Sequence, residues 1–232
     1  MESNGLKSAG MDGNQTWEQV DEHISRLFSL VDPALASALE RCEAEGLPSI
    51  QVSESQGHFL RLLVRAVGAE RVLEVGTLGG FSTILLARGF REDGIVVSLE
   101  LDPHHAAVAR SNVAAAALEK RVQVLEGDAH ASLARMIEEG EKPFDLVFLD
   151  AEKPGYPAYL DAVLALSRSG TVIIADNVVR QGAILEKDTQ DANALGAQEF
   201  HARVASSSRL SATVIQTVGS KGHDGFLFAV VE

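Results

Sequence analysis

The chain is poor in several residue types, and each scarcity narrows what it can be. Cys42 is the only cysteine, which excludes an intramolecular disulfide and a zinc site of several thiolates, and a cytoplasmic location fits this usage. Basic residues number 20 against 33 acidic ones, a formal net charge of −13 that disfavours nonspecific nucleic-acid binding. No run approaches the roughly 20 apolar residues of a membrane span. We therefore expect neither a nucleic acid nor a membrane as partner.

The remaining composition is typical of a globular protein. Of the 232 residues, 46% are hydrophobic, which excludes a wholly disordered chain. Residues 1–16 are rich in glycine, serine and asparagine and lack an apolar stretch, so they predict a flexible arm rather than a secretory signal. We predict one domain over residues 17–232, with a helical extension over 17–68 and an α/β core over 69–232.

The hydrophobic pattern changes character near residue 69. Residues 17–45 and 53–67 repeat apolar side chains at helical spacing, and Pro33 divides the first stretch into two helices. Further along, seven short β-rich runs follow, five of them alternating with helical segments and the last two joined by a turn. Strands separated by helices pair in parallel. The pattern predicts a doubly wound, Rossmann-like α/β fold: a mostly parallel seven-stranded sheet with an antiparallel C-terminal edge hairpin.

The first three predicted strands end in residues that suit a nucleoside, at the edge where such sheets bind ligands. Residues 73–82 place several glycines between a strand and a helix, which lets a ligand approach the backbone. Their spacing matches neither the dinucleotide motif nor the phosphate loop. Glu100 either accepts hydrogen bonds from ribose hydroxyls or is an ordinary surface acid at a strand tip. Asp128 either contacts an adenine amino group or caps the next helix.

The next two strand ends carry oxygen-bearing side chains. Asp150 follows the run 144–149, and Asp176 and Asn177 follow the run 172–175. If these strands are neighbours, two carboxylates and one amide converge, a donor set that suits Mg²⁺, Ca²⁺ or Mn²⁺ rather than zinc. The alternative is that each aspartate caps the helix that follows it.

Four segments together resemble the cation-dependent O-methyltransferases, the family of caffeoyl-CoA and catechol O-methyltransferases. The similarity extends from about Gln51 to the C-terminus. The combination of Asp150 with Asp176 and Asn177 separates this family from other methyltransferases of the same fold. The segments are Glu-Val-Gly-Thr-x-x-Gly-Phe-Ser-Thr at 74–83, Gly-Asp-Ala at 127–129, Phe-Asp-Leu-Val-Phe-Leu-Asp-Ala-Glu-Lys at 144–153, and Ile-Ala-Asp-Asn-Val at 174–178.

The resemblance implies S-adenosylmethionine (SAM) as methyl donor and a hydroxyl of a catechol-like or other vicinal-dihydroxy aromatic small molecule as acceptor. By position, Asp150, Asp176 and Asn177 would bind the cation, and Asp150 and Lys153 would be catalytic. Relatives that form dimers imply a homodimer. The implied cofactor contacts are Val52, Glu74, Gly76, Thr77, Ser82, Glu100, Asp128, Ala129, His130, Asp150 and Tyr159.

The implied chemistry gives these residues a reason. A phenol has a pKa near ~10 and is a poor nucleophile at neutral pH, and a divalent cation favours its phenolate form. Lys153 would accept the proton or stabilise the oxyanion as a cation. The chain departs from the family pattern at Glu152, at Arg180, where many plant members have an aromatic residue, and at His201.

Two other functions stay open at this point. An NAD(P)-dependent oxidoreductase would use the same fold and a ribose-binding acid, but the glycine spacing disfavours it. A non-catalytic nucleoside-binding module would also keep the fold. The presence of Lys153 together with the three implied cation ligands argues against that second alternative.

Overall fold

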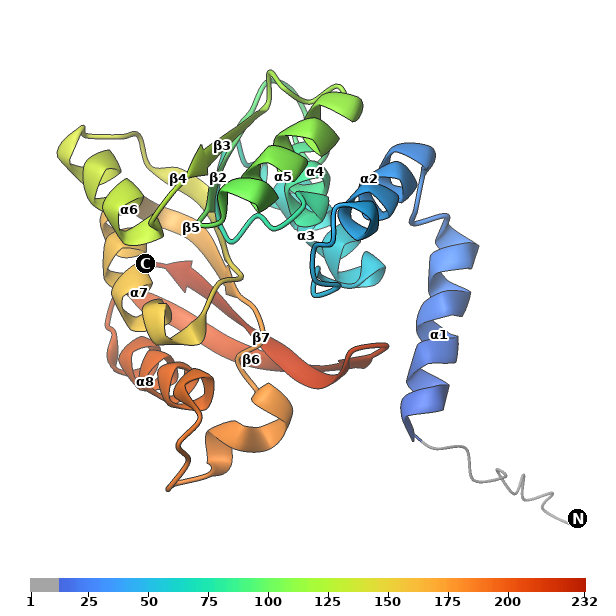
Figure 1. Cartoon of the computed structure of the whole chain (residues 1–232). Helices are drawn as coiled ribbons and strands as arrows, with labels where there is room; N and C mark the ends of the chain where they lie inside the picture. Colours follow the sequence, from blue (N-terminus) through green and yellow to red (C-terminus); the bar gives the residue numbers. More distant parts are fainter. Residues whose placement is uncertain (1–12) are drawn as a thin grey trace, which may run out of the picture.

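The computed structural model describes residues 13–232 (Figure 1). Residues 1–12 of the predicted arm lie outside the described residues, and the first helix begins at Gly13. Three helices precede the first strand: α1 (Gly13–Phe28), α2 (Pro33–Ala44) and α3 (Glu54–Val67). The α/β part then comprises β1 (Arg71–Val75), α4 (Phe81–Ala87), β2 (Ile95–Glu100), α5 (Pro103–Ala115), β3 (Val122–Glu126), α6 (Ala129–Glu138), β4 (Phe144–Leu149), α7 (Tyr156–Ala165), β5 (Ser167–Ala175), α8 (Ala192–Ser206), β6 (Leu210–Gly219) and β7 (Gly222–Val231).

The strands form one seven-stranded sheet in the order β3-β2-β1-β4-β5-β7-β6. The first five strands pair in parallel, whereas β7 pairs antiparallel with both β5 and β6. The predicted Rossmann-like fold and its antiparallel C-terminal hairpin are therefore confirmed. Because β1 lies beside both β2 and β4, the strand order reverses at β1, which is where such sheets bind ligands.

Helices cover both faces of the sheet and bury two apolar cores. One core lies under α6, α7 and α8, and the other lies under α2, α3, α4 and α5. Val147 and Ile173 point into the first core, and their neighbours Phe148 and Ile174 point into the second. Successive strand residues face opposite sides, so a strand covered on both sides must be apolar throughout. This explains the uninterrupted apolar runs in β4 and β5.

The boundaries of the early helices follow from local chemistry. Asp32 accepts a hydrogen bond from the N–H of Leu35 at 3.0 Å, and Pro33 occupies the first turn of α2. Ser53 caps α3 in the same way, and Gly68 ends it with a φ of +66°. The division at Pro33 is thus confirmed.

Helix α1 stands apart from the layered body and runs beside the tip of the β6–β7 hairpin (Figure 1). The carboxylate of Asp21 accepts the N–H of Ser220 in that tip at 2.8 Å. Val20, Leu27 and Phe28 on α1 are 50%, 64% and 67% exposed. No helix within residues 13–232 combines the length and the apolar character needed to cross a membrane.

Candidate functional site

The carboxyl ends of the central strands lie in hydrogen-bonded register. The N–H of Asp150 donates to the carbonyl of Val75 at 2.8 Å, and the N–H of Asp176 donates to the carbonyl of Leu149 at 2.9 Å. The chain turns tightly here at Gly76, which has a φ of +100°. A Cβ at this position would collide with the carbonyl oxygen of Asp150, so only glycine fits. The residues that follow β1, β4 and β5 therefore meet at one edge.

A cavity of about 670 Å³ opens at this edge. It extends from the ends of β1, β2 and β3 to the ends of β4, β5 and β7. The predicted site residues in its wall are Val52, Gly76, Thr77, Ser82, Glu100, Ala129, Asp150, Lys153 and Asn177. Those outside its wall are Glu74, Asp128, His130, Tyr159 and Asp176.

Glu100 holds the glycine-rich turn with its carboxylate. Oε2 accepts the N–H groups of Thr77 at 3.1 Å and Leu78 at 2.7 Å, and Oε1 accepts the N–H of Asp102 at 3.0 Å. A carboxylate has about four acceptor positions, so Oε1 keeps acceptor capacity at the cavity wall. The carboxylate of Glu100, the candidate ribose acceptor, therefore also fixes the glycine-rich turn.

Glu74 is fully buried beneath the cavity wall and is surrounded by hydroxyl groups. It accepts hydrogen bonds from Ser82 Oγ at 2.6 Å, Thr83 Oγ1 at 2.5 Å and Ser98 Oγ at 2.6 Å. Burial raises the pKa of Glu74 to about 7, against the opposing effect of these hydrogen bonds. Glu74 thus fixes Ser82, which itself lines the cavity.

The polar and aromatic side chains predicted around the adenine make their contacts with other residues of the protein. Asp128 caps α6 by accepting the N–H of Ala131 at 3.1 Å, the second of its two predicted alternatives. The ring of His130 stacks on that of Tyr159, with centroids 4.4 Å apart. The hydroxyl of Tyr159 donates to Glu152 at 2.6 Å. Of the neighbouring residues, Ala129 lines the cavity.

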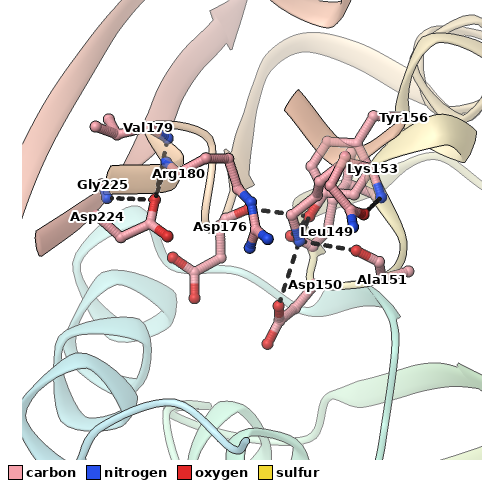
Figure 2. A network of polar contacts seen from close by, with 11 residues as sticks. Leu149, Asp150, Ala151, Lys153, Tyr156, Asp176, Val179, Arg180, Asp224 and Gly225 are labelled. Atoms are coloured by element: carbon pink, nitrogen blue, oxygen red, sulfur yellow. Dashed lines mark hydrogen bonds and ion pairs between the residues drawn. The ribbon is translucent and has the colours of Figure 1, made fainter. Parts of the chain in front are cut away.

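Asp150 and Asp176 direct their carboxylates to the same side of the strand tips (Figure 2). Asp176 is 3% exposed, and burial together with the charge of Asp150 raises its pKa to about 7. Burial also raises the pKa of Asp150, with Lys153 opposing the shift. Asp176 and Asn177 line a smaller hollow of about 260 Å³ that shares Asn177 with the main cavity.

These side chains fit a divalent cation by the chemistry of their donors. They offer carboxylate and amide oxygens, the ligands that Mg²⁺ and Ca²⁺ prefer, and the mutual repulsion of Asp150 and Asp176 is what a bound cation would relieve. Within residues 13–232, no group of three or more His, Cys, Asp or Glu side chains is arranged to hold a metal. The candidate set has two such residues, and its third member is the amide of Asn177.

Lys153 extends its amino group beside this cluster (Figure 2). Its side chain is 5% exposed, and Nζ lies 3.9 Å from Asp150 Oδ1. Nζ donates to the carbonyl of Ala151 at 2.8 Å and to the hydroxyl of Tyr156 at 3.0 Å. Burial lowers the pKa of Lys153. The structure therefore brings together Asp150, Lys153 and Asn177 as the sequence predicts.

Four charged residues in the wall of the cavity escaped the sequence-based site prediction. They are Glu152, Arg180, Lys221 and Asp224. Oδ1 of Asp224 accepts the N–H groups of Val179 at 3.0 Å and Arg180 at 2.9 Å, so it holds the segment that follows β5. Asp224 and Gly225 lie within β7, not in a turn, and only the antiparallel pairing of β7 with β5 shows what Asp224 faces.

The fold and the cavity define a class of α/β proteins that bind a nucleoside at the carboxyl edge of a Rossmann-like sheet. Comparison with known proteins identifies the family within this class. A sequence model described as O-methyltransferase matches residues 29–227. The chain belongs to this family of SAM-dependent O-methyltransferases.

Individual relatives agree over nearly the whole chain. A catechol O-methyltransferase of Mycobacterium tuberculosis is 47% identical over 222 residues, which cover 96% of this chain and 99% of that protein. One of Niastella koreensis is 43% identical over 219 residues, covering 94% and 99%. The O-methyltransferase of Bacillus cereus in complex with SAH has a TM-score of 0.93 at 47% identity, covering 94% of this chain and 100% of that one. TomG of Streptomyces achromogenes in complex with SAM has a TM-score of 0.91 at 42% identity, covering 95% and 99%.

Proposed function

We propose that this enzyme transfers the methyl group of SAM to one hydroxyl of a vicinal-dihydroxy aromatic small molecule, and that it requires a divalent cation, Mg²⁺ first and Ca²⁺ or Mn²⁺ as substitutes. One observation carries the proposal: Asp150, Asp176 and Asn177 meet at adjacent strand tips, beside a cavity that the glycine-rich turn also lines. The two relatives named as catechol O-methyltransferases support it.

In this proposal, SAM occupies the half of the cavity at β1, β2 and β3. Oε1 of Glu100 accepts a ribose hydroxyl, and Ala129 contacts the adenine. Gly76, Thr77 and Ser82 contact the methionine end, and Ser82 is oriented for this by Glu74. Val52 and Asp150 border the position of the methyl group. Asp128, His130 and Tyr159 act from behind the wall, where Asp128 caps α6 and the two rings stack.

The acceptor then occupies the half at β4, β5 and β7. A cation held by Asp150, Asp176 and Asn177 would supply the positive charge that favours the phenolate form of the acceptor. Lys153 lies next to Asp150, and its amine, whose neutral form burial favours, accepts the proton of the reacting hydroxyl and becomes an ammonium. The contacts of Nζ with Ala151 and Tyr156 hold the amine in one place, which fixes the direction of the proton transfer.

We also propose the remaining expectations of the sequence: a single catalytic domain over residues 17–232, a homodimer and a cytoplasmic location. The exposed apolar side chains of α1 support self-association, because α1 buries few of them within its own chain. Sedimentation of the purified protein tests the dimer; a monomer at all concentrations contradicts it.

A methyl-transfer assay with paired acceptors tests the main proposal. Catechol and phenol differ by one hydroxyl, and each is incubated with labelled SAM and Mg²⁺. We expect methylation of catechol and none of phenol, because only the vicinal pair can chelate a cation. Equal rates for both would overturn the vicinal-dihydroxy assignment. Tighter calorimetric binding of NAD than of SAM would revive the oxidoreductase alternative.

A further inference from the structure

Arg180 places an unpaired cation in the wall of the cavity. It follows β5 at the start of a short 3-10 segment, Arg180–Leu185, and lines the main cavity. Its Nε is buried and has no hydrogen-bond partner. Within residues 13–232, no carboxylate forms an ion pair with its guanidinium. Figure 2 shows this side chain directed to the same side as the carboxylates of Asp150 and Asp176. The guanidinium therefore has donors to offer to something other than the protein.

The backbone around Arg180 is held in an uncommon conformation. Arg180 and Gln181 have φ values of +55° and +54°, in the left-handed region that residues with a Cβ seldom adopt. Asp224 accepts the N–H of Arg180 and so fixes this turn from β7. Backbone strain of this kind collects at functional sites. Asp224 acts here as a positioning residue, because it holds the backbone of Arg180 and leaves the guanidinium free.

The location of Arg180 indicates what it would bind. SAM occupies the β1–β3 half of the cavity in the proposed function, so the side chains at the β4–β7 half face the acceptor. The basic side chains on that side are those of Lys153, Arg180 and Lys221. Lys153 is engaged with Ala151 and Tyr156, and Lys221 is exposed on the β6–β7 turn, where solvent weakens its attraction for an anion. Arg180 is the cation with a buried, unsatisfied donor.

We propose that Arg180 binds a carboxylate on the acceptor, so that the preferred substrates are catechol-like acids rather than neutral catechols. A guanidinium presents its donors in a planar fork that matches the two oxygens of a carboxylate. This inference rests on the proposed function, since it takes the β4–β7 half as the acceptor's place. The competing role for Arg180 is to stack on the acceptor ring, which would treat acids and neutral compounds alike and would leave Nε unsatisfied.

The test compares 3,4-dihydroxybenzoate with 3,4-dihydroxybenzamide, which has nearly the same shape and no charge. Methylation gives kcat/KM, and calorimetry in the presence of S-adenosylhomocysteine gives binding without turnover. We expect the unmodified enzyme to prefer the acid by about 10-fold or more in both readouts. Arg180→Gln should lower kcat/KM for the acid by about 10-fold and for the amide by less than about 3-fold.

Two further variants sharpen the result. Lys187→Gln removes one positive charge from an exposed position between β5 and α8, the connection that also contains Arg180. It should leave the ratio of kcat/KM for the acid to that for the amide unchanged. Arg180→Lys keeps the charge but loses the planar fork, so the ratio should fall by a smaller factor, roughly 3-fold. If Arg180→Gln no longer binds SAM, its fold is damaged, and the ratio measured for Arg180→Lys decides.

The possible failures are distinguishable. If the unmodified enzyme methylates the amide as well as the acid, or if Arg180→Gln slows both equally, the carboxylate assignment is overturned while the proposed function stands. If neither compound is methylated with SAM and Mg²⁺ present, the proposed function fails and this inference fails with it.

Discussion

The two halves of the cavity treat their carboxylates differently. In the β1–β3 half, Glu74 accepts three hydroxyl groups and Glu100 accepts three backbone N–H groups, so the protein holds both carboxylates in place, and Glu100 Oε1 keeps acceptor capacity for a ligand. In the β4–β7 half, Asp150 has Lys153 at 3.9 Å, and its charge helps to raise the pKa of Asp176. The first half is complete before a ligand binds, and the second half holds charges that the protein leaves unbalanced.

This difference distinguishes residues that position a ligand from residues that take part in the reaction. A carboxylate that the protein's own hydrogen bonds hold in place fixes the shape of a turn and positions a ligand. A crowded, partly desolvated group of acids with a buried lysine is the arrangement expected where ligands complete a reactive site. Changes in the β4–β7 half should therefore reduce turnover, and changes in the β1–β3 half should reduce cofactor affinity or stability.

The largest effect is expected for Asp176→Ala. Loss of one proposed cation ligand should lower kcat by about 1000-fold, because the phenolate form of the acceptor is no longer favoured. SAM affinity, measured by calorimetry, should change by less than about 3-fold, since Asp176 lies outside the wall of the main cavity. Asp188→Ala, which removes an exposed acid from the same connection between β5 and α8, is the matched control. Full activity of Asp176→Ala would remove this residue from the site.

Glu74→Gln should change the pH dependence of stability. The folded pKa of Glu74 is about 7, above its ordinary value of 4.5. Between these pH values the folded chain keeps a proton that the unfolded chain releases, so stability falls as pH rises from about 4.5 to 7. The free energy of unfolding should fall by about 3 kcal/mol more in the unmodified protein than in Glu74→Gln over this window. Denaturant melts at several pH values measure this, and parallel curves would contradict it.

Lys153→Met should lower kcat by about 100-fold, the usual contribution of a general base. Methionine fills most of the space of the lysine stem, with sulfur in place of Cδ, and lacks the amine, so SAM binding should be unchanged. Single-turnover methylation of catechol provides the measurement. Turnover within about 3-fold of the unmodified enzyme would leave Lys153 a structural role, as the partner of Ala151 and Tyr156.

Glu100→Gln should have the smallest effect. The amide can still accept one or two of the three backbone N–H groups, but it weakens the proposed ribose contact. We expect the dissociation constant of SAM to rise by about 10-fold, with kcat at saturating SAM changed by less than about 2-fold. A drop in kcat without a change in affinity would reverse the assignment of the two halves.

Most of the fold could be predicted from local patterns. Apolar runs that alternate with amphipathic segments require a parallel sheet covered on both faces, and the last two runs lack a helix between them, which requires a hairpin. Polar residues at strand ends meet at one edge, so the convergence of Asp150 and Asn177 followed on the condition that their two strands are neighbours, which the structure shows.

The rest of the site depends on contacts between distant segments. Asp224 faces Arg180 only because β7 inserts between β5 and β6, and no local pattern reveals that order. Glu74 is surrounded by three hydroxyl groups because Ser82 and Thr83 begin α4 while Ser98 comes from β2. A strand-end acid looks the same in the sequence whether it faces a ligand or the protein interior.

One measurement tests the difference between the two halves most directly: SAM binding and catechol methylation are recorded on the same protein, first with Mg²⁺ and then with excess chelator. If the β1–β3 half is complete in itself and the β4–β7 half needs a cation, SAM should bind with nearly equal affinity in both conditions, and methylation should occur only with Mg²⁺. Methylation at full rate in excess chelator would contradict the account.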